Sequence, residues 1–182
     1  MIIGITGTLG AGKGTVVEYL KTKGFKHYSS SNILKEMLAQ RGEVPTRKAM
    51  SDLANELMAQ NEGGILHYSH ERAQKDGAED YVLEAIHRVS EAEYLRKIGG
   101  KVLGVDADMK TRYARAIKRK EGEKDNVTFE QFVEDTKRED EGVTGTGPNI
   151  RAVLQSADAV VMNDGTLGEL HAQIEEALKK LS

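Results

Sequence analysis

The chain has 182 residues, of which 38% are hydrophobic, and this length and apolar content suit one compact domain spanning residues 1–182. Its 26 basic residues are outnumbered by 29 acidic ones, and the net charge of -3 argues against a protein that wraps a nucleic-acid backbone and favours a small charged metabolite as partner. No cysteine is present, which excludes disulfides, thiolate metal sites and a cysteine nucleophile.

Short β-branched apolar runs alternate with helix-like patterns along the chain, which predicts an α/β protein with a parallel sheet covered by helices. The runs are too apolar for a half-exposed sheet and indicate strands buried on both faces. We expect these strands over Met1–Thr6, Lys26–Ser29, Tyr81–Glu84, Lys101–Asp106 and Asp158–Met162.

Helices are predicted between the strands. The first is expected over Thr15–Lys23, and a mostly helical insert is expected over residues 32–76. Further helix starts are indicated by a capping Thr46 and by three Ser/Thr-x-x-Glu/Gln boxes, in which the two side chains satisfy each other's backbone amides. The boxes pair Ser90 with Glu93, Thr128 with Gln131, and Thr166 with Glu169.

A glycine-rich loop with one lysine, Gly-Thr-Leu-Gly-Ala-Gly-Lys-Gly-Thr over residues 7–15, separates the first strand from the first helix. Glycines let a backbone approach an anion closely, so that successive amides point at phosphate oxygens. The helix amino terminus and Lys13 add positive charge. The order strand, loop, helix therefore predicts a phosphate-binding loop formed by Leu9, Gly10, Ala11, Gly12, Lys13, Gly14 and Thr15.

The ending Gly-Lys-Gly-Thr of this loop resembles the phosphate loop of nucleoside monophosphate kinases such as adenylate kinase. The resemblance implies ATP and Mg2+ as cofactors, with Lys13 gripping the β- and γ-phosphates. It also implies a three-layer P-loop kinase fold, with a five-stranded parallel sheet, helices on both faces, a helical acceptor-binding insert at about 32–76 and a small lid at about 112–148. Thr15, one place later than the hydroxyl of the general motif, and Glu84 are the expected Mg2+ ligands, Glu84 either directly or through water.

The acceptor side is expected around residues 28–35, Tyr-Ser-Ser-Ser-Asn-Ile-Leu-Lys. This stretch is similar to a monophosphate-kinase segment in which an acid and an arginine follow small hydroxyl residues. Here Asn32 replaces the acid and Lys35 replaces the arginine. The similarity implies that Ser31, Lys35 and Arg47 bind the acceptor, but the serines and Asn32 could instead cap a helix and leave Lys35 solvated.

The third strand ends at Glu84, and the residues after it resemble the Asp-Gly-x-Arg stretch of small kinases, including archaeal adenylate kinase-related proteins. This similarity implies that Glu84 organises Mg2+ or accepts a proton. His87 stands at the arginine position and Arg88 follows it, so Arg88 is the predicted acceptor-binding residue. Either basic residue could instead be a solvated residue at a helix start.

Arg112, Arg115 and Arg119 share one face of a predicted helix, and this spacing resembles the lid entrance of monophosphate kinases. The resemblance implies that Arg115 and Arg119, with Arg138 on a later helix, neutralise the transferring phosphates, although such a face could also be a solvated stripe. The last strand and the turn after it look like those of dephospho-coenzyme A kinases, which implies that the backbone near Asn163 and Gly165 contacts the adenine.

These resemblances imply an ATP-dependent nucleotide kinase that phosphorylates a small nucleotide, most simply a (deoxy)nucleoside monophosphate. Two alternatives stay open: transfer to a hydroxyl, as in dephospho-coenzyme A kinase, and a non-catalytic nucleotide-binding regulator. No Asn-Lys-x-Asp motif of a guanine-reading switch is present. No basic leader and no apolar stretch of about 20 residues is present, so we expect a cytoplasmic protein without membrane or nucleic-acid partners, whose oligomeric state the sequence leaves open.

Overall fold

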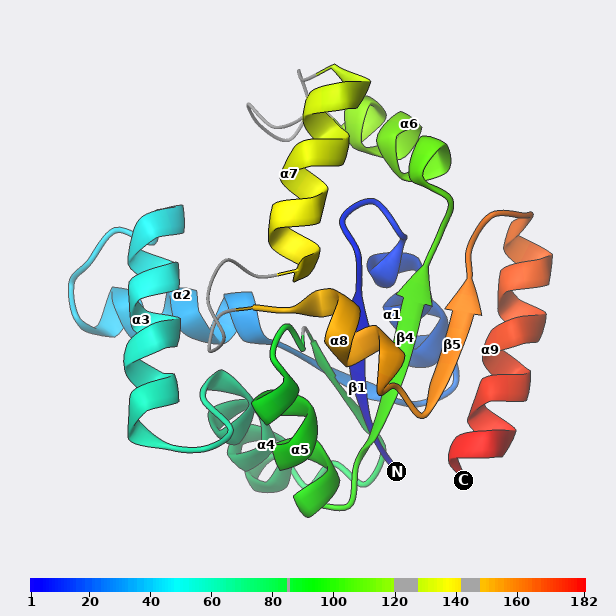
Figure 1. Ribbon diagram of the computed structural model, residues 1–182. Coiled ribbons are helices and arrows are strands. Elements are labelled where there is room, and N and C mark those ends of the chain that lie inside the picture. Colours follow the sequence, from blue (N-terminus) through cyan, green and yellow to red (C-terminus); the bar gives the residue numbers. More distant parts are fainter. Residues whose placement is uncertain (85, 120–127, 142–147) are drawn as a thin grey trace.

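The computed structural model describes residues 1–84, 86–119, 128–141 and 148–182, except for the side chains of Arg119 and of residues 138–141. Its centre is a parallel sheet with the strand order β2-β3-β1-β4-β5 (Figure 1). The predicted parallel sheet is therefore confirmed, and only the ends of the first and last strands shift by one residue. The strands are β1 (Ile2–Gly7), β2 (Lys26–Ser29), β3 (Tyr81–Glu84), β4 (Lys101–Asp106) and β5 (Ala159–Met162).

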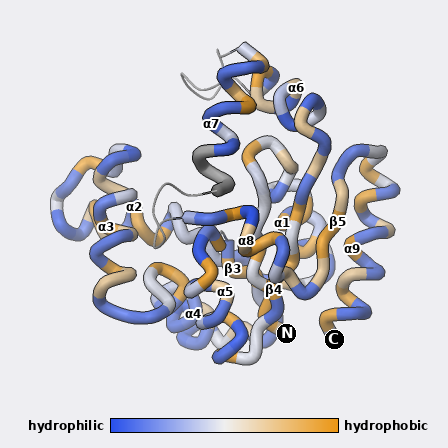
Figure 2. Tube along the Cα trace, in the orientation of Figure 1, coloured by the Kyte–Doolittle hydropathy of each residue, from blue (hydrophilic) through white to orange (hydrophobic). Residues whose placement is uncertain are grey.

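Helices cover both faces of the sheet, as the predicted three-layer fold requires. On one face, the buried Ile3 and Ile5 of β1 share a hydrophobic core with residues of α1 (Lys13–Thr22) and α9 (Leu167–Leu181). On the other face, a second core joins β3 and β4 to α4 (Ile65–Lys75), α5 (Val89–Lys97) and α8 (Ile150–Gln155). Figure 2 shows hydrophobic residues concentrated at the strands and hydrophilic ones over the peripheral helices.

Gly4 allows one of these faces to pack closely. Side chains alternate along a strand, so Gly4 points to the face opposite to that of Ile3 and Ile5. A Cβ atom at Gly4 would overlap the side chains of Ile86 and Leu95. The missing side chain therefore lets α5 and the segment after β3 lie directly against β1.

The predicted insert consists of α2 (Ser30–Gln40), α3 (Arg47–Gln60) and α4, and α2 and α3 lie beside the sheet in Figure 1. These helices have a core of their own, which contains the buried Leu34, Leu38, Leu53, Leu57 and Ile65. The predicted cap of α3 is confirmed, because the Thr46 side chain accepts a hydrogen bond from the Ala49 amide at 3.1 Å.

Two of the three predicted capping boxes are confirmed. Thr128 pairs with Gln131 at the start of α7 (Phe129–Glu141), and Thr166 pairs with Glu169 at the start of α9. The box at Ser90 is wrong, because α5 begins at Val89 and Glu91, which is only 5% exposed, takes the capping role. Its carboxylate accepts hydrogen bonds from the amides of His87 at 2.8 Å and Arg88 at 3.0 Å.

The region predicted as a lid is described in part. It contains α6 (Met109–Arg119) and α7, which lie above the loop that follows β1 (Figure 1). Residues 120–127 and 142–147 of this region lie outside the described residues. Among the described helices, none is both long and apolar enough to cross a membrane.

Candidate functional site

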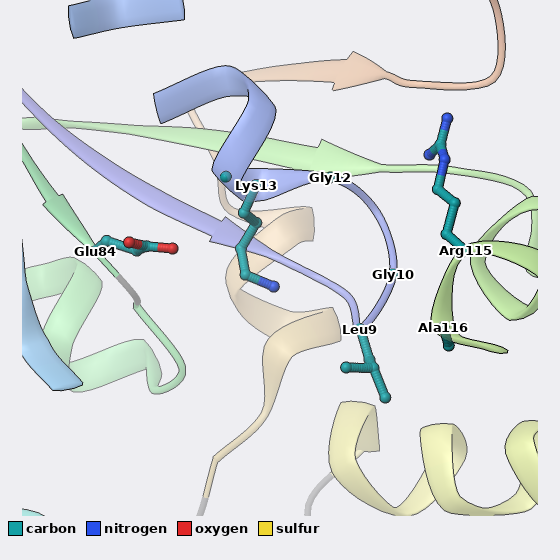
Figure 3. Close-up of a pocket in the computed structure, with 8 residues that line it drawn as sticks. Leu9, Gly10, Gly12, Lys13, Glu84, Arg115 and Ala116 are labelled. Atoms are coloured by element: carbon teal, nitrogen blue, oxygen red, sulfur yellow. The ribbon is translucent and has the colours of Figure 1, made fainter. Parts of the chain in front are cut away.

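A cavity of about 300 Å³ lies at the carboxyl ends of β1 and β3, beneath α6 (Figure 3). The phosphate loop forms one wall, Glu84 comes from the end of β3, and α6 supplies Arg115 and Ala116. The structure therefore brings together residues that are far apart in the sequence. The described lining residues, all predicted except Ala116, are Leu9, Gly10, Gly12, Lys13, Gly14, Glu84, Arg115 and Ala116.

The loop between β1 and α1 has the conformation of an anion cradle. Gly12 has a φ of 96°, a left-handed conformation that glycine adopts without strain, and it is the N-cap of α1. The helix begins at Lys13, two residues earlier than predicted, because Thr15 and Val16 donate their amide hydrogens to the Gly12 carbonyl. The positive end of the α1 dipole is thereby directed at the cavity.

Lys13 folds back over this loop. Its Nζ donates hydrogen bonds to the carbonyl oxygens of Gly7, at 2.8 Å, and Thr8, at 3.2 Å. Figure 3 shows its side chain between the loop and Glu84. The lysine thus places a positive charge inside the cradle.

Glu84 is the acid of the cavity, and His27 on the neighbouring strand holds it. Nε2 of His27 lies 2.8 Å from Oε2 of Glu84. This hydrogen bond holds the pKa of Glu84 below its ordinary value, and the charges of Lys13 and His87 act in the same direction against the effect of burial. Glu84 is therefore ionised near neutral pH. Sequence reasoning missed His27, because its partner is defined only by the adjacency of β2 and β3.

The arginines of α6 contact the phosphate loop and the turn after β5. Arg115 donates through Nη2 to the carbonyl of Asn163 at 2.8 Å, and Arg112, which is 4% exposed, donates through Nε to the carbonyl of Leu9 at 2.9 Å. The predicted arginine face is thus not a solvated stripe at Arg112. The side chains of Arg119 and Arg138, the other two predicted catalytic arginines, lie outside the described residues.

The remaining predicted cofactor-binding residues lie around the cavity rather than on its described wall. Ala11 is buried, and its carbonyl accepts a hydrogen bond from Nδ2 of Asn163 at 2.8 Å. Thr15 is exposed in the first turn of α1, and Gly165 lies in the turn between β5 and α9. The structure thus gives Asn163 a role in holding the loop that the sequence did not predict.

The four predicted acceptor-binding residues are not on the described wall of this cavity. Ser31 is exposed and its hydroxyl lies 3.0 Å from that of Ser29, while Lys35 and Arg47 are exposed on α2 and α3. Arg88 is half-buried and donates through Nη2 to Oδ1 of Asn55 at 2.7 Å. Ser31 and Arg88 follow the ends of β2 and β3, which lie side by side because Ser29 is paired with Glu84.

The few side-chain oxygens in the site fit a metal cation that takes most of its ligands from a bound nucleotide and from water. Within the described parts of the chain, no group of three or more histidine, cysteine, aspartate or glutamate residues is placed to hold a metal ion. Glu84 offers a carboxylate in the cavity, and Thr15 offers a hydroxyl beside Gly12. One or two such oxygens, with phosphate oxygens and water, are the usual ligand set of Mg2+.

Comparisons with known proteins agree with this geometry. A family model described as an AAA domain matches residues 3–143. A UPF0200 protein from Sulfurisphaera tokodaii is 30% identical over 183 residues, which is 99% of this chain and 97% of the relative. Shikimate kinase from Bacteroides thetaiotaomicron has a similar structure, with a TM-score of 0.62, 13% identity and 98% of both chains covered. Dephospho-CoA kinase from Campylobacter jejuni follows with a TM-score of 0.56 and 16% identity, covering 100% of this chain and 97% of that one.

Proposed function

For this chain, which belongs to the AAA domain family and to the UPF0200 proteins, we propose the function of an ATP-dependent kinase that transfers the γ-phosphate to a small nucleotide, a (deoxy)nucleoside monophosphate. One observation carries the proposal. The phosphate loop with Lys13, the ionised Glu84 and Arg115 of α6 line the same cavity. Phosphoryl transfer needs this combination, because its catalysis consists mainly of positioning and charge neutralisation.

On the donor side, the loop amides and Lys13 would bind the phosphates of ATP. The Lys13 ammonium exchanges its bonds to the Gly7 and Thr8 carbonyls for phosphate oxygens, which needs only a rotation of its side chain. Mg2+ bound with ATP supplies further neutralisation of the phosphate charge, and Glu84 and Thr15 would hold it directly or through water. Arg115, with Arg119 and Arg138, would approach the transferring group from α6 and α7.

On the acceptor side, basic residues at the start of the insert and after β3 suit an anionic acceptor. Lys35 makes no ion pair with any described side chain, and its position one turn after Ser31 puts the two on one face of α2. Arg88 would turn its guanidinium from Asn55 to the acceptor phosphate, and Arg47 would add a second positive charge at the start of α3. These three basic residues would bind the nucleotide that receives the phosphoryl group, whereas the loop and Lys13 would bind ATP.

The ionised Glu84 also favours a second candidate, transfer to a hydroxyl group. A hydroxyl nucleophile needs a carboxylate within reach to accept its proton, whereas a phosphate nucleophile does not. One structural neighbour is named dephospho-CoA kinase, and its name gives dephospho-CoA as its substrate. Glu84→Gln separates the two candidates, because it would nearly abolish transfer to a hydroxyl but reduce transfer to a phosphate only through metal placement.

The proposed function is tested by measuring ADP release from Mg2+ and ATP over a panel of ribo- and deoxynucleoside monophosphates and dephospho-coenzyme A. We expect turnover that depends on one acceptor and is lost in Lys13→Ala. Lys21→Ala is the matched control, because Lys21 lies on the same helix but pairs with Glu18 on the surface. Turnover without any acceptor would refute a kinase, and ATP binding with no turnover on any acceptor would favour the regulator.

A further inference from the structure

The carbonyl of Ala11, in the middle of the phosphate loop, is held from outside the loop. Nδ2 of Asn163 donates a buried hydrogen bond to it at 2.8 Å, and Nη1 of Arg115 lies 3.5 Å from the same oxygen. Asn163 follows β5, is 7% exposed and is separated from Ala11 by 152 residues in the chain. The backbone amide of Asn163 also donates to the carbonyl of Asp106 at 2.8 Å, which fixes the backbone from which the side chain extends.

The orientation of this carbonyl determines where the next amide points. In a trans peptide, the carbonyl oxygen of Ala11 and the N–H of Gly12 lie on opposite sides of the same planar group. Asn163 holds the oxygen from the end of β5, and Gly12 is one of the residues that line the cavity. The Gly12 amide therefore points away from the Asn163 side chain, and a phosphate bound in the cavity would accept its hydrogen there.

This orientation needs an external support, because glycine has more backbone freedom than any other residue. The Asn163 side chain lies so close to Gly12 that a Cβ atom on Gly12 would overlap Nδ2. Within the described residues, Gly12 donates its amide to no backbone carbonyl outside regular elements, whereas its own carbonyl accepts from α1. The contacts that restrain this peptide on the carbonyl side thus come from Asn163 and Arg115.

We propose that Asn163 is a positioning residue for nucleotide phosphates, which holds the Ala11 carbonyl and thereby fixes the Gly12 amide in its phosphate-binding orientation. The inference rests on the proposed function only in that the loop must bind a phosphate. This role differs from a contact with adenine, because the side-chain amide of Asn163 donates to the Ala11 carbonyl of the protein. Arg115 joins the same arrangement, since its Nη2 donates to the Asn163 carbonyl at 2.8 Å and so links α6 to the loop.

Two variants and a matched control test the inference. Asn163→Asp keeps the shape of the side chain but removes the donor, and Asn163→Ala removes the donor without adding charge. A loss shared by both variants therefore comes from the donor and not from a new carboxylate. Gln173→Glu is the control, because the Gln173 amide on α9 donates a hydrogen bond of similar length, 2.9 Å, to the carbonyl of Met162, the residue before Asn163, and neither residue lines the cavity.

The measurements are ADP affinity by calorimetry and the Gly12 amide resonance in nitrogen-15 NMR spectra. In the unsubstituted protein, ADP should shift this resonance downfield. Both Asn163 variants should bind ADP about ten- to a hundredfold more weakly, as expected for one charge-assisted hydrogen bond, and should lose the shift. Gln173→Glu should keep both.

The outcomes separate the inference from the proposed function. If the unsubstituted protein fails to bind ADP, the proposed function fails and takes this inference with it. If it binds ADP and the Asn163 variants bind equally well, only the inference is overturned. It is also overturned if the variants bind weakly but the Gly12 resonance still shifts as before, because the amide would then be correctly oriented without Asn163.

Discussion

Replacement of Gly12 by alanine should destabilise the fold by an amount that the structure lets us estimate. An alanine at a φ of 96° costs about 1–2 kcal/mol, because its Cβ atom crowds the backbone in the left-handed region. The same atom would overlap Nδ2 of Asn163 and displace the hydrogen bond to Ala11, and leaving a buried polar group without its partner costs about 1–3 kcal/mol. Gly12→Ala should therefore lower the free energy of unfolding by about 2–5 kcal/mol.

Two control variants separate these contributions. Gly42 has a φ of 74°, and an added Cβ atom there would meet open space. Gly42→Ala should therefore lower the free energy of unfolding only by the cost of the left-handed conformation, about 1–2 kcal/mol. Gly14 lies in α1 with no atom near a Cβ, so Gly14→Ala should be neutral or stabilising by up to about 1 kcal/mol. The assay is urea unfolding followed by circular dichroism. If Gly12→Ala costs no more than Gly42→Ala, the argument that Asn163 packs against the loop is wrong.

Three further predictions concern stability. His27→Ala should lower the free energy of unfolding by about 1 kcal/mol at neutral pH; because the pKa of Glu84 is depressed in the fold, this loss should persist above the ordinary carboxyl range and vanish as the pH falls through the depressed pKa. Carbon-13 NMR of the Glu84 carboxyl should show that its pKa rises in the variant, and an unchanged pKa would contradict the pairing. Leu57→Ala should cost about 2–5 kcal/mol, because Leu57 is 1% exposed in the core of the insert, and hydrogen exchange should accelerate more in α2 and α3 than in the sheet. Thr166→Ala should cost about 1 kcal/mol in urea unfolding through loss of the α9 cap, and no loss would mean that Glu169 alone suffices.

The sequence predicted the sheet and the loop well for a physical reason. Strands buried on both faces read as continuous apolar runs, and a phosphate loop needs glycines at fixed spacing, so both signals are local in the chain. The start of α5 was less predictable, because Ser90 and Glu91 are both plausible capping residues. Only burial distinguishes them, and the buried Glu91 satisfies two amides that would otherwise lack a partner.

Contacts between neighbouring strands and layers could not be predicted from the sequence. The pairing of His27 with Glu84 depends on β2 lying beside β3, and chain order alone does not define that adjacency. Helical periodicity placed Arg112 and Arg115 on one face, but it could not tell that this face meets the loop at Leu9 and the turn at Asn163. Residues whose partners lie one strand or one layer away therefore need the folded structure.

The strand order assigns each side of the cavity a different part of the proposed reaction. All five strands are parallel, so the segments that follow them leave the sheet at the same edge. The phosphate loop follows the central β1. On one side of it, α6 follows β4 and Asn163 follows β5; on the other side, Glu84 ends β3 and α2 follows β2. Under the proposed function, a phosphate held by the β1 loop would therefore have the residues that support ATP on the β4 side and the acceptor on the β3 side. Substitutions at Asn163 should accordingly change the KM for ATP, whereas substitutions at Lys35 should change the KM for the acceptor.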